Sequence, residues 1–318
     1  MKRTKATMYR SALAMSFAAM GMTTLPAPAK EPAGIAPATV RMTVTASVDE
    51  GKRMPEIQKE DVSVRKGKDR LPVTQWVAAR GEFAGLELFV LIDDASNASL
   101  GSKLDELRAF INAQPATSLV GVGYMRNATV QIVQNPTTDH AQAAKTLRLP
   151  LGSVGAYGSP YLSVIDLMKR WPASANRREI VMVADGIDRA RRGRNALLNP
   201  DVDTANDVAQ RTGTIIHTIY SPGAGHWNRN LWDATNGANG LAKLSDVTGG
   251  ESFYLGLASP ITFAPYLDQL QRALDNQYWL SFSPLPDQKA GLQRITVGTE
   301  LAGVDLNAAD AVWVPGVK

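Results

Sequence analysis

The sequence contains no cysteine and only three histidines among its 318 residues. Without cysteine the chain forms no disulfide and carries no lipid on a processed cysteine, so its stability must come from its core. The histidines His140, His217 and His226 are scattered, which argues against zinc, because zinc sites combine closely spaced cysteine and histidine ligands. Also absent are the G-x-S-x-G, H-E-x-x-H, Walker and G-x-G-x-x-G motifs. We therefore expect that the protein is not an enzyme.

An excess of charge of one sign is also missing from most of the chain. The formal net charge is +4, from 34 basic and 30 acidic residues. The whole difference lies in Lys2, Arg3, Lys5 and Arg10, and no acidic residue occurs among residues 1–29. A chain without these four residues is close to neutral. Such a chain has no global electrostatic affinity for nucleic acid, and we expect no nucleic-acid partner.

The basic residues at the N-terminus precede the apolar stretch SALAMSFAAMGM, and small residues follow at Ala27 and Ala29. This order is typical of a signal peptide, predicted here as residues 1–29. The stretch is shorter than the about 20 apolar residues that a membrane span needs, so we expect no stable span after its removal. The protein is therefore predicted to be secreted, into the periplasm or outside the cell. Residues 30–37 are predicted to form a linker.

The two ends of the remaining chain have β character. In the N-terminal β segment, 38–80, apolar residues alternate with polar ones at Val40, Met42 and Val44, and the turn KGKD separates two short strands. The C-terminal β segment, 277–318, opens with the alternating stretch QYWLSFS. We expect the two segments to pack together as a small β side module.

Residues 84–275 alternate between wholly apolar strands and amphipathic helices. The strands are LELFVLI, EIVMVA and TIIHTIY, and SKLDELRAFINAQ is a typical helix with Ser102 as its cap. Another helix begins with Ser159 as cap and Pro160 in its first turn. Wholly apolar strands between such helices indicate a sheet covered on both faces. The predicted fold class is α/β, with a Rossmann-like, doubly wound, mostly parallel sheet.

Polar residues follow the strands of this predicted sheet. Asp93 and Asp94 end the first strand, Ser159 opens a later helix, and Asp185 with Gly186 ends the strand EIVMVA. In an open parallel sheet, ligands bind beyond the carboxyl ends of the strands. We therefore expect Asp93, Ser159 and Asp185 to meet at one edge.

This succession of loops resembles the von Willebrand factor type A (vWFA) domain. The chain is similar in particular to exported bacterial vWFA-related proteins, which share the stretches KEDVSVRKGK, TGGESFY and QYWLSFSP and a final Trp313 and Pro315. The likeness covers nearly all of the chain after the predicted signal peptide. It implies a vWFA-like fold for residues 84–275 and a function in protein binding.

In that family a D-x-S-x-S turn, a threonine and a further aspartate form a metal-ion-dependent adhesion site for Mg²⁺. Carried over, the resemblance implies metal ligands at Asp93, Asn97, Ser159 and Asp185. The first serine position holds Ala95, which offers no donor, so the site is degenerate. A register one residue later uses Asp94 and Ser96 instead. Each residue also has a local interpretation, with Asp93 binding backbone N–H groups of its turn and Ser159 only capping a helix.

Two further stretches follow strands of the same predicted sheet, RARRGR after Asp185 and GAGHWNRNLW after TIIHTIY. Arginine and tryptophan are enriched where interfaces concentrate binding energy. We therefore expect a protein partner, bound in part through one of its acidic side chains. The predicted partner-binding residues are Arg189, Arg191, Arg192, Arg194, Trp227 and Trp232.

Two functions remain open from the sequence. The first is an exported, non-enzymatic adhesion or interaction module that binds a protein through the strand-end edge. The alternative is a structural or assembly component of the cell envelope, in which the β module makes the contacts and the metal site is vestigial. A phosphatase-like use of Asp93 as nucleophile requires a second aspartate two residues later, where Ala95 stands.

Overall fold

The computed structural model describes residues 39–49, 51–152, 158–190, 200–224, 230–254, 256–286 and 289–316. The chain divides into two compact units, Met1–Ala36 and Pro37–Lys318, and all described residues belong to the second. The predicted signal peptide 1–29 and the linker 30–37 lie outside the described residues and stay predictions. In the described part of the chain, no helix combines the length and apolar character of a membrane span.

Segments from both ends of the described chain pair in one small β module. Its four-stranded sheet has the order β14-β1-β11-β4, in which β1 runs antiparallel to β11 with Val44 opposite Tyr278. The alternating residues Val40, Met42 and Val44 are buried against Leu280, as their pattern predicts. The strands of the module are β1 (Val40–Val48), β2 (Val62–Lys66), β3 (Asp69–Leu71), β4 (Val73–Ala78), β11 (Gln277–Phe282), β12 (Gly291–Arg294), β13 (Thr296–Thr299), β14 (Val304–Ala308) and β15 (Ala311–Val314).

The residues between these segments form an α/β domain around a six-stranded sheet of order β10-β9-β8-β5-β6-β7. Neighbouring strands are parallel except for the pair β6 and β7, which is an antiparallel hairpin at one edge. The central strand β5 is buried at every position, because its neighbours and helices cover both faces. The strands are β5 (Leu86–Asp93), β6 (Ser118–Arg126), β7 (Thr129–Thr137), β8 (Arg177–Ala184), β9 (Thr214–Tyr220) and β10 (Ser252–Phe253).

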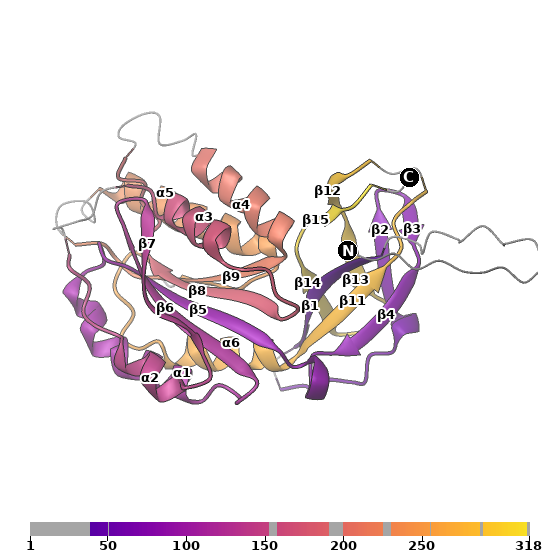
Figure 1. Ribbon diagram of the computed structural model, residues 1–318, viewed down its shortest axis with the longest axis horizontal. Helices are drawn as coiled ribbons and strands as arrows, with labels where there is room; N and C mark the ends of the chain where they lie inside the picture. Colours follow the sequence, from indigo (N-terminus) through magenta and orange to yellow (C-terminus); the bar gives the residue numbers. More distant parts are fainter. Residues whose placement is uncertain are drawn as a thin grey trace, which may run out of the picture. The chain divides into compact units, whose positions relative to one another are not determined.

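Helices cover the two faces of this sheet (Figure 1), with α1, α2 and α6 on one face and α3, α4 and α5 on the other. They are α1 (Leu104–Asn112), α2 (His140–Lys145), α3 (Pro160–Arg170), α4 (Pro200–Thr212), α5 (Leu231–Thr248) and α6 (Ala264–Asp275). Short 3₁₀ helices are η1 (Lys59–Asp61), η2 (Gly81–Phe83) and η3 (Ala98–Lys103). The predicted fold class, a mostly parallel α/β sheet with a small β module, is confirmed.

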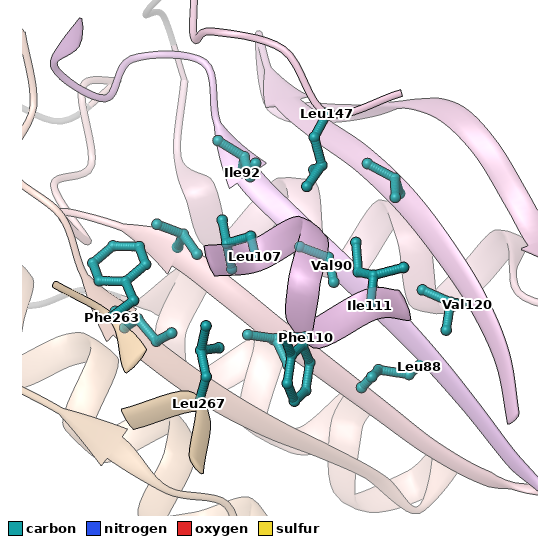
Figure 2. Packing of buried hydrophobic residues seen from close by; sticks show 14 of the residues in the cluster. Leu88, Val90, Ile92, Leu107, Phe110, Ile111, Val120, Leu147, Phe263 and Leu267 are labelled. Atoms are coloured by element: carbon teal, nitrogen blue, oxygen red, sulfur yellow. The ribbon is translucent and has the colours of Figure 1, made fainter. Parts of the chain in front are cut away.

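Alternate residues of β5 belong to different cores, as expected for a strand whose side chains point to opposite faces. Figure 2 shows Leu88, Val90 and Ile92 facing helix α1, where Leu107 and Ile111 pack against them. The residues between them, Phe89 and Leu91, belong to the cluster on the other face, under α3 to α5. The strand is thereby held in a fixed position, and so is Asp93 at its end.

Two helix starts differ from the prediction. Ser102 lies inside η3 and its hydroxyl donates to the Ser99 carbonyl, 3.0 Å away, while α1 begins at Leu104. Helix α5 begins at Leu231, inside the stretch GAGHWNRNLW that follows β9, and Asn230 caps it by accepting from the Trp232 N–H at 3.1 Å. Trp232 therefore stands in the first turn of a helix and not in a loop.

Candidate functional site

Asp93 and Asp185 meet at the carboxyl edge of the sheet, and the side chain of Arg189 joins them. Arg189 Nη1 lies 3.4 Å from Asp93 Oδ2, and Arg189 Nη2 lies 2.5 Å from Asp185 Oδ2. All three residues are buried, with exposed fractions of 5% for Asp93, 1% for Asp185 and 4% for Arg189. The site is therefore an internal cluster of two carboxylates and one guanidinium.

Each aspartate also closes its own turn. Asp93 Oδ1 accepts a hydrogen bond from the Ala95 N–H at 2.8 Å, and Asp185 Oδ1 accepts one from the Ile187 N–H at 2.9 Å. In both residues one carboxylate oxygen thus binds the backbone two residues later and the other faces Arg189. Asp93 therefore binds the backbone of its own turn, as the local interpretation predicts, and also takes part in the cluster with Arg189 and Asp185.

The surrounding loops hold Arg189 in place. Its backbone N–H donates to the Gly158 carbonyl at 3.2 Å, which ties the segment after β8 to the start of α3. The loop after β9 comes so close that a Cβ atom on Gly223 would lie 2.1 Å from Asp185 Oδ2 and 2.6 Å from Arg189 Nη2. Only glycine fits at this position without movement of the cluster.

Backbone hydrogen bonds between two loops close the cluster from outside. The Asn97 N–H donates to the Pro222 carbonyl at 2.9 Å, and the Ala224 N–H donates to the Ala95 carbonyl at 2.8 Å. The loops after β5 and β9 therefore pair directly over the strand ends. This pairing covers the cluster on the side of these two loops.

Ser159 occupies the cap position of α3, as predicted, but its hydroxyl caps nothing. The hydroxyl is buried and has no hydrogen-bond partner within the described residues. It lines a hollow of about 10 Å³ together with Asp93 and Arg189, room for about one water molecule. The structure thus brings Asp93, Ser159 and Asp185 to one place, with Arg189 in contact with both aspartates.

The remaining predicted ligands are Asn97, Asp94 and Ser96, and the first two bind groups outside the cluster. The amide oxygen of Asn97 accepts from the Ser99 N–H at 2.9 Å and caps η3. Asp94, the aspartate of the alternative register, binds Arg148 with both oxygens, at 2.7 Å and 3.0 Å. Ser96 is buried, and its hydroxyl has no partner in the part of the chain that the structure describes.

This arrangement does not fit a Mg²⁺ ion. Octahedral Mg²⁺ needs oxygen ligands around a free central position, whereas the guanidinium of Arg189 lies between the oxygens of Asp93 and Asp185. Ala95 contributes no donor, and the oxygen of Asn97 is engaged in η3. The described ranges contain no group of three histidine, cysteine, aspartate or glutamate residues that could hold a metal.

Burial governs the ionisation of the cluster. It raises the pKa of Asp93 to about 6, although the positive charge of Arg189 acts in the opposite direction. Burial also raises the pKa of Asp185. For Arg189, burial disfavours the charge, but Asp185 and Asp93 outweigh it and raise the pKa of the guanidinium. Arg189 therefore stays charged wherever the protein is folded.

The predicted partner-binding residues separate into three groups. Arg189, expected on the surface, is instead buried inside the site, because two carboxylates bind its guanidinium. Trp232 is 55% exposed at the start of α5, as partner binding requires. The others lie outside the described residues: Arg191, Arg192, Arg194 and Trp227.

A set of exposed apolar side chains lies at the same edge of the sheet as the cluster, and the sequence reasoning missed most of them. We call this set the apolar rim; it consists of Leu149, Leu151, Leu231, Trp232, Tyr254 and Ile261. Each belongs to the loop before α3, the start of α5 or the loop between β10 and α6, all at the carboxyl edge of the sheet. No periodic pattern distinguishes these residues in the sequence, because four of them stand in loops and Leu231 and Trp232 stand at the very start of a helix.

The order and directions of the strands decide what kind of domain this is. A mostly parallel sheet has an antiparallel strand, β7, at one edge, and aspartates end the neighbouring strands β5 and β8. The α/β domain has a vWFA-like fold. The resemblance seen in the sequence is confirmed at the level of the fold.

Comparisons with known proteins found no matching family model and no matching curated protein. Among solved structures, an aerotolerance-related membrane protein from Bacteroides fragilis is 12% identical at a TM-score of 0.38, covering 60% of this chain and 99% of its own. The protein BatB from Bacteroides thetaiotaomicron is 10% identical at 0.38, covering 59% and 97%. The VWA domain of SpRpn10 is 11% identical at 0.39, covering 59% and 96%. These likenesses concern only the fold.

Proposed function

We propose that the protein is an exported, non-enzymatic module that binds another protein through the apolar rim of its vWFA-like domain. One observation carries the proposal. Of the seven large hydrophobic side chains that are exposed among the described residues, six form the apolar rim, and only Trp313 lies in the β module. Single exposed apolar residues are normal on proteins, but a group of them at one edge marks an interaction site.

The composition of the rim suits a binding surface. Trp232 and Tyr254 are aromatic, 55% and 43% exposed, and such residues often dominate interface energies. Ile261 is 94% exposed, so its whole side chain is available to an apolar partner segment. Burying one such side chain contributes roughly 1.5–3 kcal/mol.

Contacts with the domain hold the rim residues in position. The Leu151 N–H donates to Asp94 Oδ1 at 3.3 Å, and Tyr254 packs edge to face on Tyr220 at 5.2 Å between ring centroids. The loop of Ile261 is linked to η3 by a hydrogen bond of 3.3 Å between the hydroxyls of Ser99 and Ser259. A preformed surface loses less conformational entropy on binding, which favours recognition.

The internal cluster supports a non-enzymatic role. Both oxygens of Asp93 are engaged, one by the Ala95 N–H and one by Arg189, so this carboxylate does not face a substrate as a nucleophile. Arg189 is equally unavailable to an acidic side chain of the partner. We therefore propose that the partner contributes apolar side chains, and export follows from the N-terminal pattern described above.

A site-specific crosslinking experiment tests the proposal. A photoreactive amino acid replaces Trp232 or Ile261 in the full chain expressed in its native cells, and Trp313 of β15 serves as the matched exposed control. We expect adducts with one protein from positions 232 and 261, and none from 313. Adducts from position 313 alone would instead support the envelope component whose β module makes the contacts.

The identified protein is then purified and its affinity measured directly. Trp232→Ala should weaken binding by about 2 kcal/mol or more, the size typical of an interface hot spot. Trp313→Ala should leave the affinity unchanged. An equal loss in both variants would show that the rim is not the binding surface.

A further inference from the structure

We propose that Arg189 is the permanent cation of the strand-end site, so that the folded protein fills this site from its own chain and takes no divalent metal there. The proposal concerns the interior of the site and does not depend on which partner the rim binds. It rests on the contacts of Arg189, on the loops that enclose it, and on the oxygen atoms that would remain without it.

The first support is charge balance. Asp93 and Asp185 are both buried, and two carboxylates at such a place require a positive charge beside them. Arg189 supplies it with one nitrogen to each carboxylate, at 3.4 Å and 2.5 Å. The planar fork of a guanidinium is suited to binding two acceptors at once. The guanidinium occupies the position between the two carboxylates, and its positive charge would repel a divalent ion placed beside it.

The second support is that the enclosure is shaped around the guanidinium. Besides the two carboxylates, Nη1 donates to the Ile187 carbonyl at 3.3 Å. Gly223 leaves just enough space for Nη2, since a Cβ atom there would lie 2.6 Å from it. The side chain of Arg189 is 2% exposed, so an incoming ion would have to displace a buried guanidinium.

The third support is what the site would become without Arg189. Its removal frees the carboxylate oxygens of Asp93 and Asp185 that now bind it. The hydroxyl of Ser159, which has no partner among the described residues, lines the same hollow as Asp93. Carboxylate and hydroxyl oxygens are the hard donors that Mg²⁺ and Mn²⁺ prefer. A cation site is therefore latent in this chain and is occupied by Arg189.

Metal titration of the full chain tests the proposal, with Mn²⁺ as the probe because free and bound Mn²⁺ are distinguished by electron paramagnetic resonance. Wild type should show no saturable Mn²⁺ binding at millimolar concentration. Arg189→Ala should gain one saturable site, with a Kd at least about tenfold below the highest Mn²⁺ concentration at which wild type shows no saturation. Its Tm should rise with MgCl₂ but not with NaCl of equal ionic strength.

The matched control is Arg170→Ala. Arg170 also binds an aspartate four residues earlier, Asp166, at 2.5 Å, but this pair is exposed at 45% and 30%. The control should bind no Mn²⁺ and should show no specific response to MgCl₂. A gain of Mn²⁺ binding in Arg170→Ala would mean that loss of any arginine charge has this effect, and it would overturn the proposal.

Arg189→Lys keeps a cation at the position. It provides a second variant for the test in case Arg189→Ala does not fold. It should remain folded and bind no Mn²⁺. Saturable Mn²⁺ binding by wild type or by Arg189→Lys would overturn the proposal. A folded Arg189→Ala variant without Mn²⁺ binding would also overturn it, because the remaining oxygens would then not form a cation site.

Discussion

The interior of the strand-end edge and the apolar rim lie at the same edge of the sheet but have opposite characters. Inside, Asp93 and Asp185 are buried and share the guanidinium of Arg189. Outside, Trp232 and Ile261 are exposed without covering neighbours. Polar residues at strand ends thus stabilise the domain itself, while the surface available to a partner is apolar and lies in the loops and at the start of α5.

The largest effect is expected when the cation is removed from the interior. Arg189→Ala leaves two buried carboxylates without a counter-charge, and we expect a loss of about 3–5 kcal/mol in the free energy of unfolding. Arg170→Ala, at the exposed pair with Asp166, should cost about 0.2–1 kcal/mol. Urea unfolding of both variants measures the difference. Equal losses would mean that the buried cluster contributes no more than a surface pair.

The contribution of the buried cluster to the free energy of unfolding should depend on pH, whereas that of the rim should not. Burial raises the pKa of Asp93 from 3.8 to about 6, so the folded state binds a proton more tightly than the unfolded chain. The resulting stabilisation is fully present below pH 3.8 and is lost as the pH rises through about 6. At most about 3 kcal/mol is expected, because each pKa unit corresponds to about 1.4 kcal/mol.

Unfolding of wild type and Asp93→Asn from pH 4 to pH 7.5 measures this contribution. The amide does not titrate, so the variant should lose the decline in stability that Asp93 causes in wild type. Identical pH profiles for the two proteins would contradict a raised pKa for Asp93.

A smaller effect on stability is expected when a side chain is added at Gly223, which lies against the cluster. Gly223→Ala places a methyl group 2.1 Å from Asp185 Oδ2, so the carboxylate or the loop must move. Overpacking of this kind costs about 1–3 kcal/mol. At Gly298 of β13 the nearest atom to an added Cβ would be 3.7 Å away, which is ordinary contact. Gly298→Ala should therefore change the free energy of unfolding by no more than about 0.5 kcal/mol.

The smallest effect on stability is expected at the rim. Ile261→Ala should change the free energy of unfolding by less than about 0.5 kcal/mol, because its side chain is 94% exposed. The same substitution at Ile216, fully buried in β9, should cost about 2–5 kcal/mol. Thermal unfolding of both variants checks this contrast. A large loss at Ile261 would show that the rim is part of the fold and not a free surface.

The sequence predicted the frame of the site well. Strands β5, β8 and β9 are mostly apolar, and such strands are recognisable without long-range information. Once these strands are placed side by side, Asp93 and Asp185 must come to the same edge. Their convergence could therefore be predicted from strand ends alone.

The role of Arg189 could not be predicted in the same way. In the run RARRGR nothing local separates this arginine from its neighbours, and only the three-dimensional position of Asp93 explains why it is buried. Asp94 likewise binds Arg148, 54 residues away in the sequence. The start of α5 at Leu231 is not evident from the sequence, because Gly237 inside the helix has low helix propensity. Its small size is needed, since a Cβ there would lie 2.3 Å from the Asp185 carbonyl.

The most direct test of the closed interior is a crystal structure of the full chain grown with MnCl₂, with anomalous diffraction recorded for manganese. The account predicts density for the Arg189 guanidinium between Asp93 and Asp185, and no anomalous peak at that place. A manganese peak bound by Asp93, Ser159 and Asp185, with Arg189 turned out to solvent, would contradict it.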